Sequence, residues 1–257
     1  MVIAQKADKF IINVFKLSVG NLYAQIIGVI AVPLLTRIFA PSAFGLYALF
    51  TSIVTILGMM ACLRYEITIV LPEKEEEAVT LTVLSFCFTV ITTLVISLLV
   101  FFCGKNIARY LNMPGLSGYL WMLPLAAFVL GAYTVLNFWN TRKKDFGTIS
   151  LSRVLASTVD IGMKIGLGFL GYATGGILIS TTVLGNIASL IFLALVVLVR
   201  YGSLFKKYFD PGQLLPALKR YVKFPLLSSG SFLLNSISLQ VPVWILAVFF
   251  SSEIVGF

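Results

Sequence analysis

The composition of this 257-residue chain excludes a soluble globular domain, since 59% of its residues are hydrophobic, only 11% are charged and the mean hydropathy is +1.02. These values are typical of a polytopic membrane protein. The chain contains no histidine, which excludes catalysis by a histidine acid or base and metal ligation by histidine. The net charge of +9 requires no nucleic-acid partner, because basic residues facing anionic lipid headgroups account for it.

The three cysteines do not form a recognisable site. Cys62, Cys87 and Cys103 lack the paired spacing of metal ligands. Two of them lie within apolar runs, where a thiol packs like a small hydrophobic group. We therefore expect no disulfide, no metal and no cofactor.

The first apolar run, residues 11–38, contains a polar stripe. Asn21 and Gln25 are one helical turn apart and so share a face. In a membrane span such a face turns from lipid toward other helices or a cavity. Arg37 stands at the end of this run, before the connection at Pro41. An arginine in that place either snorkels to the membrane interface or serves a ligand.

Two more apolar runs follow, at 46–63 and 78–102. Arg64 marks the interface after the second run, and residues 67–71 should return the chain along that interface. An acidic cap at 73–77 precedes the third run, and its carboxylates favour a helix N-terminus. These features predict two spans joined by an interfacial turn.

The fourth and sixth runs differ in polarity. A loop at 105–118 should lead to the fourth run, 119–140, in which Tyr133 and Asn137 form a second polar stripe at helical spacing. The sixth run, 176–199, has no charged residue. We expect it to face lipid or to be packed against other helices.

The fifth run, 151–170, is the most unusual, because it contains Arg153, Asp160 and Lys164. Helical spacing places all three on one face. Asp160 and Lys164 are one turn apart, so they can pair within the helix and lower the cost of placing either in the membrane. As the acid inside a span, Asp160 is either a coupling site for a proton or cation, or only a structural partner of Lys164.

The C-terminal part begins with a basic interval. Residues 200–223 alternate lysine and arginine with aromatic residues and leucines, a pattern that predicts a cytoplasmic amphipathic helix on anionic lipid. The seventh run, 224–250, carries Asn235 on its polar face. The first run contains F-x-L at 15–17 and V-P at 32–33, and the seventh run contains the same two patterns at the same spacing, at 224–226 and 241–242. The seventh span therefore resembles a repeat of the first.

These observations predict an all-α polytopic membrane protein. Residues 1–199 should form an N-terminal six-helix transmembrane bundle, and residues 200–223 should form a linker. Residues 224–257 should then supply the first helix of a second bundle, related to the first as a parallel repeat. On this interpretation the chain is a truncated form of a longer protein.

The basic residues predict the orientation. If seven spans cross the membrane and the N-terminus is cytoplasmic, Arg37, Lys105 and Arg109 fall outside and Lys164 lies within a span. All the others of the 19 lysines and arginines then lie on the cytoplasmic side. This strong asymmetry places the N-terminus inside.

Four features in order resemble the polysaccharide flippases, the O-antigen and exopolysaccharide exporters related to lipid II flippases and, more distantly, to multidrug and toxic compound extrusion transporters. They are PLLTRIFAPSAFGLY at 33–47, LRYEITIVLP at 63–72, the basic loop followed by SRV at 152–154, and the restart at the seventh run. The resemblance implies a bacterial inner-membrane protein, not an enzyme, with two bundles around a cavity that opens alternately to each side. It also implies a lipid-linked oligosaccharide substrate, with sugars on undecaprenyl diphosphate.

The polar residues of the spans are candidates for binding such a substrate. A diphosphate needs cationic partners, and hydroxyl-rich sugars need amides and hydroxyls. The candidates for the diphosphate are Arg64, Arg153, Lys164 and, more weakly, Arg37. The candidates for the sugars are Asn21, Gln25, Tyr133, Asn137 and Asn235. Hydrogen bonding between helices is the alternative role for each amide, and Asp160 is the ion-coupling candidate.

Three other function classes are weighed against the flippase. A membrane enzyme of the same pathway would need catalytic groups gathered at one face, usually on a sizeable outer loop, and the outer loops here are short. A cation-coupled drug antiporter would have a more apolar cavity with fewer basic residues. A non-transporting scaffold that docks other membrane proteins of a polysaccharide pathway remains open.

Overall fold

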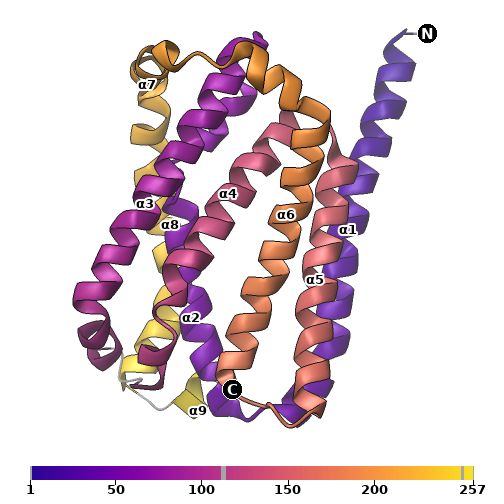
Figure 1. Cartoon of the computed structure of the whole chain (residues 1–257). Helices are drawn as coiled ribbons and strands as arrows, with labels where there is room; N and C mark the ends of the chain where they lie inside the picture. The colour runs from indigo at the N-terminus through magenta and orange to yellow at the C-terminus, as the bar shows by residue number, and fades with distance from the viewer. Residues whose placement is uncertain (1, 111–113, 250–251, 257) are drawn as a thin grey trace.

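The protein is a bundle of long helices (Figure 1). The computed structural model describes residues 2–110, 114–249 and 252–256, and no strand occurs among them. The long helices are α1 (Val2–Ile38), α2 (Pro41–Met60), α3 (Glu75–Tyr110), α4 (Met122–Arg142), α5 (Phe146–Phe169), α6 (Gly175–Tyr208) and α8 (Lys223–Phe249). The short elements are η1 (Tyr65–Val70), η2 (Pro114–Gly118), η3 (Pro211–Gln213), α7 (Leu214–Tyr221) and α9 (Ser252–Val255). The predicted all-α class is confirmed.

Several helices are long and apolar enough to cross a membrane. Within the described part of the chain there are six, and they lie in α1, α2, α3, α4, α6 and α8. The 24-residue α5 is long enough, but it carries Arg153, Asp160 and Lys164. The protein is therefore a multi-pass membrane protein in which one helix, α5, is unusually polar.

The helices pack in a definite order around α5 and α4. Helix α5 contacts α1 on one side and α6 on the other, while α4 contacts α2, α3 and α6. Helix α8 lies against α2, and α7 closes one end over α3 (Figure 1). This arrangement places the charged face of α5 against elements that are far apart in the sequence.

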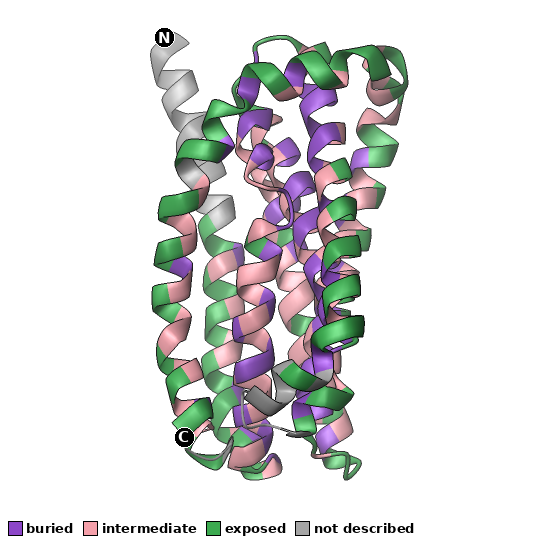
Figure 2. Ribbon diagram, turned by 90° about the vertical axis from the view of Figure 1, so that its left-hand side faces the viewer, coloured by how far each residue is buried: buried purple, intermediate pink, exposed green. Residues whose placement is uncertain are grey.

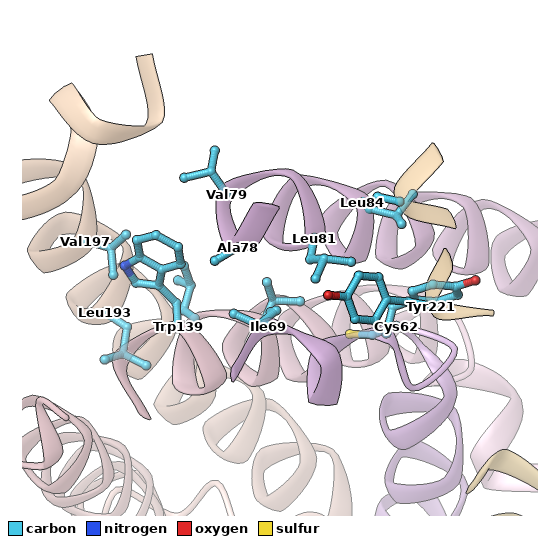
Figure 3. Close-up of a cluster of buried hydrophobic side chains, with 14 residues drawn as sticks. Cys62, Ile69, Ala78, Val79, Leu81, Leu84, Trp139, Leu193, Val197 and Tyr221 are labelled. Atoms are coloured by element: carbon cyan, nitrogen blue, oxygen red, sulfur yellow. The ribbon is translucent and has the colours of Figure 1, made fainter. Parts of the chain in front are cut away.

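The largest core cluster lies at the α7 end of the bundle. Figure 3 shows Trp139 of α4 next to Val197 of α6, in the same cluster as Ile69 of η1. The indole is fully buried, and its ring also contacts the rings of Tyr201 and Phe205. Helices α3, α4 and α6 are thus held together with η1 by aromatic and aliphatic packing.

The outer faces of the bundle are apolar. Figure 2 shows exposed residues along the outward sides of the helices and buried residues toward the interior. Val29 of α1 is 72% exposed, Phe101 of α3 is 82% exposed and Leu227 of α8 is 80% exposed. Exposed apolar surface of this extent is unfavourable in water but suits a hydrocarbon environment.

Two predicted boundaries were wrong. The loop expected at 105–118 is helical up to Tyr110, because no helix breaker occurs before Pro114. Likewise α6 continues to Tyr208, because the next proline is Pro211. The amphipathic helix expected over 200–223 is therefore confined to α7, residues 214–221.

Candidate functional site

A pocket of about 350 Å³ lies among α1, α4, α5 and α6. Ala24 of α1 and Tyr133 of α4 line two of its sides. Its other polar lining residues are Arg153, Ser157 and Asp160 of α5 and Thr182, Asn186 and Ser189 of α6. It is thus a cavity in the helical bundle that combines charged, hydroxyl and amide groups.

The Asp160–Lys164 pair lies at this pocket. Lys164 Nζ lies 2.8 Å from Asp160 Oδ2, so the predicted pairing within α5 is confirmed. The lysine side chain is only 7% exposed and the aspartate 20%. Pairing is what makes these charges tolerable inside a membrane span, because an isolated charge there is costly.

Side chains of α2 and α6 provide the other hydrogen-bond partners of this pair. Lys164 Nζ donates to the hydroxyls of Thr182 on α6 (2.9 Å) and Tyr47 on α2 (3.4 Å), and lies 4.6 Å from the centre of the Tyr47 ring. The Thr182 hydroxyl lies 3.0 Å from Asp160 Oδ1. Both carboxylate oxygens therefore have a hydrogen-bond donor, and the pair joins α2, α5 and α6.

Gly185 allows α5 and α6 to approach at this point. A Cβ atom at residue 185 would lie 2.7 Å from the carbonyl oxygen of Ala156 and 3.0 Å from Cβ of Asp160. A larger residue would therefore push α6 away from the aspartate. In α5, Gly168 lies similarly close to Ile38 of α1, whereas Gly162 and Gly166 have open space around them.

Arg153 connects the pocket to α1. Its Nη1 donates to Oδ1 of Asn21, so Asn21 of the predicted polar stripe turns toward another helix, whereas Gln25 of the same stripe is exposed. The hydroxyls of Tyr23 and Thr158 add a second α1–α5 contact at 3.1 Å. On the α4 side, the Tyr133 hydroxyl lies 3.3 Å from the Ser152 hydroxyl. The structure thus brings Asn21 and Tyr133 to the part of α5 that carries Arg153, while Lys164 lies about three turns away beside Asp160.

The other predicted site residues lie outside this pocket. Gln25 and Arg37 of α1 are exposed, as is Asn235 of α8. Asn137 is half-buried, and its Oδ1 lies 3.5 Å from the Thr141 hydroxyl. Arg64 belongs to a different cluster, where it pairs with a glutamate of η1.

Sequence reasoning missed the contribution of α2 and α6. Helix α6 was expected to be only lipid-facing or packed, yet Thr182, Asn186 and Ser189 line the pocket. These three residues recur at helical spacing, so a polar stripe was present in the sequence. Tyr47 carried no such signal, because its role depends on which helix packs beside α5.

The charges of the site suit an anion. Arg153 in the lining and Lys164 beside the pocket oppose the Asp160 carboxylate, and the other polar lining groups are hydroxyls and an amide. Guanidinium and ammonium groups bind phosphate oxygens strongly, and hydroxyls and amides bind sugar hydroxyls. No cluster of three acidic or cysteine ligands suitable for a metal ion occurs in the part of the chain that the structure describes.

Comparison with known protein families identifies the family of this chain. The family described as "Polysaccharide biosynthesis protein" matches residues 34–257. The match covers most of the chain, from the end of α1 through α8, and it includes the pocket residues of α4, α5 and α6 but not Ala24 of α1. Neither the curated proteins nor the solved structures contain a significant match.

Proposed function

The chain belongs to the polysaccharide biosynthesis protein family, and from this premise we propose that it translocates a lipid-linked oligosaccharide across the bacterial inner membrane by alternating access. The observation that carries the proposal is the pocket that Arg153 and Asp160 line together with hydroxyl and amide groups, with Lys164 paired to Asp160 beside it. The pocket lies between α5 and α1, α4 and α6, three helices that are long and apolar enough to cross a membrane. A sugar chain on a lipid diphosphate presents both an anion and many hydroxyls. The pocket offers a partner for each.

The position of α1 fits a substrate with a lipid tail. Ala24 of α1 lines the pocket, while Val29 and Ile30 of the same helix are 72% and 71% exposed. A carrier whose diphosphate enters the pocket can therefore keep its apolar tail in the bilayer beside α1. Burying a charged headgroup then does not require burying the tail in protein.

The Asp160–Lys164 pair suggests how transport is coupled. Without substrate, Asp160 neutralises Lys164 at 2.8 Å. A diphosphate that binds Lys164 competes with this carboxylate, and a proton or cation taken up by Asp160 releases the lysine for the substrate. Coupling then arises from competition for one ammonium group.

The proposed orientation has the N-terminus in the cytoplasm. The start of α1 and the amphipathic α7 lie at the same end of the bundle (Figure 1), as the distribution of basic residues requires. Single cysteines at positions 143 and 207 should react with a membrane-impermeant reagent only from the cytoplasmic side, and one at position 105 only from outside. Labelling of positions 105 and 143 from the same side would contradict this topology.

The function is tested by complementation. The full-length gene, expressed in a bacterial strain that lacks its polysaccharide flippase, should restore surface polysaccharide. Cells with an inactive variant should accumulate the lipid-linked oligosaccharide on the cytoplasmic side. A scaffold would instead reduce synthesis of the lipid-linked intermediate, and failure to rescue with any glycan supplied would contradict the proposal.

A further inference from the structure

A strained turn between α2 and η1 brings a second acid into the protein interior. Leu63 and Arg64 have φ angles of 48° and 65°, although neither is glycine. Consecutive non-glycine residues in this left-handed region are unfavourable and persist only when their surroundings hold them there. The turn directs η1 into the main core cluster, where Tyr65 and Ile69 are buried.

Glu66 is the acidic residue that this turn buries. Its side chain is 2% exposed, and Oε1 lies 3.5 Å from Nη1 of Arg64. The other oxygen, Oε2, is buried and has no hydrogen-bond partner in the described structure, and the same holds for Nε of Arg64. A buried carboxylate with one unpartnered oxygen is costly while it is ionised.

Few charged groups face this carboxyl group. Arg64 is its cationic neighbour, and the Cys62 thiol, held against Thr89 of α3 and the Gly131 carbonyl of α4, lies close enough to interact electrostatically. The Arg142 guanidinium of α4 is occupied by the carbonyls of Ile69 and Pro72 at the far end of η1.

Helices α7 and α8 also pack beside Arg64 and Glu66, but the described contacts include no charged group from either helix. From α7, the Leu218 carbonyl accepts a hydrogen bond from the Tyr65 hydroxyl. From α8, the contact to Arg64 is the ring of Phe232. One cation and one thiol therefore set the electrostatic surroundings of Glu66.

We propose that Glu66 is a proton-binding site, separate from the Asp160 pocket, that holds a proton on Oε2 at pH values where exposed glutamates are ionised. A proton fits because Oε2 is enclosed and lacks the several oxygen ligands that a metal cation requires. Burial raises the pKa of the Glu66 carboxyl, while its own backbone N–H and Arg64 oppose the shift.

Proton binding at Glu66 has a consequence at α8. The Arg64 guanidinium carbon lies 3.9 Å from the centre of the Phe232 ring on α8. When Glu66 is neutral, this ring is the remaining described partner of the cation. The protonation state of Glu66 thus alters how η1 is joined to α8.

The test compares the thermal unfolding of the purified full chain with that of Glu66→Gln across pH. A carboxyl group whose pKa is higher in the folded protein stabilises fully below its unfolded pKa, and this stability is lost as pH rises through the folded pKa. Glu66→Gln mimics the protonated state. It should raise the Tm at neutral pH by about 2–4 °C, and the difference should vanish in acid.

The matched control is Glu73→Gln, which removes an exposed glutamate from the same loop and should leave the pH trend unchanged. A lower Tm, or no accumulation, of Glu66→Gln at neutral pH would overturn the proposal, because that result means that ionised Glu66 stabilises the fold. Infrared spectroscopy of the unmodified chain provides a second measurement. The C=O stretching band of a protonated carboxyl group should persist at pH values above those at which exposed glutamates ionise, and its frequency should shift in Glu66→Asp. Absence of that band would also overturn the proposal.

Discussion

The Asp160–Lys164 pair in α5 and the Arg64–Glu66 pair at the start of η1 each place an acid beside a base inside the protein, but they differ in how completely they are hydrogen-bonded. Both carboxylate oxygens of Asp160 have donors, supplied by α5 and α6. Glu66 has one ion-pair partner, Arg64 at 3.5 Å, and one unpartnered oxygen. The charges of the first pair are thus compensated by hydrogen bonds, whereas the second pair leaves one buried carboxyl oxygen without a partner.

The largest effect expected is on transport. Lys164→Ala removes the buried cation beside the pocket and should abolish export of surface polysaccharide while the protein remains inserted and abundant. The measurement is complementation together with immunoblotting of the membrane fraction. Lys206→Ala, at an exposed lysine of α6, is the control and should export normally. Loss of the protein itself in Lys164→Ala would show that the pair is structural.

Asp160, the carboxylate of the same pair, should control the coupling of export to an ion gradient. Asp160→Asn keeps the shape of the side chain but cannot take up a proton, so the dependence of export on ion gradients should change while some export remains. Export is measured with the proton and sodium gradients collapsed separately. If the pair is only structural, the double variant Asp160→Asn with Lys164→Gln should restore abundance and export together, and full activity in that variant would contradict the coupling proposed here.

Helix packing at the pocket gives a smaller effect on stability. Gly185→Ala places a Cβ against the Ala156 carbonyl at 2.7 Å, and overpacking of this kind costs about 1–3 kcal/mol. The thermal stability of the purified chain should fall. Gly162→Ala, at a glycine of α5 with open space around it, is the control and should not lower it. Equal effects at the two positions would mean that α5 and α6 do not approach closely at Asp160.

The contrast between the two pairs also shows what could be predicted from the sequence. Helical spacing correctly placed Arg153, Asp160 and Lys164 on one face, because a contact four residues apart is a local property of the helix. The partners Tyr47 and Thr182 could not be assigned, because spacing does not reveal which helices are neighbours.

Arg64 shows a second limit of sequence reasoning. It was expected to serve the substrate, but in the structure it contacts Glu66 and Phe232. The burial of Glu66 depends on two non-glycine residues with positive φ, and residue preferences do not indicate such a conformation.

The same limit applies to helix ends. The acidic residues before the third run were correctly expected at a helix start, and Glu75–Glu77 lie in the first turn of α3. The ends of α3 and α6 were placed too early, because a fall in hydrophobicity marks the membrane boundary and not the helix end. Both helices continue until a proline approaches.

The smallest effect expected is at the contact between Arg64 and α8. Phe232→Leu keeps the apolar volume but removes the aromatic face, and a cation–π contact of this kind contributes about 0.5–1 kcal/mol, so the Tm should fall by about 1–4 °C. With Glu66 neutral, the ring is the remaining described partner of Arg64, so the same substitution should cost more in a Glu66→Gln background. A double-mutant cycle measured by thermal unfolding at neutral pH gives this coupling directly. Leu234→Ala, at a residue of α8 that is 70% exposed, is the control and should show equal effects in both backgrounds. If Phe232→Leu is also additive with Glu66→Gln, then Glu66 does not influence the α8 contact through Arg64, and the two pairs differ only in their hydrogen bonding.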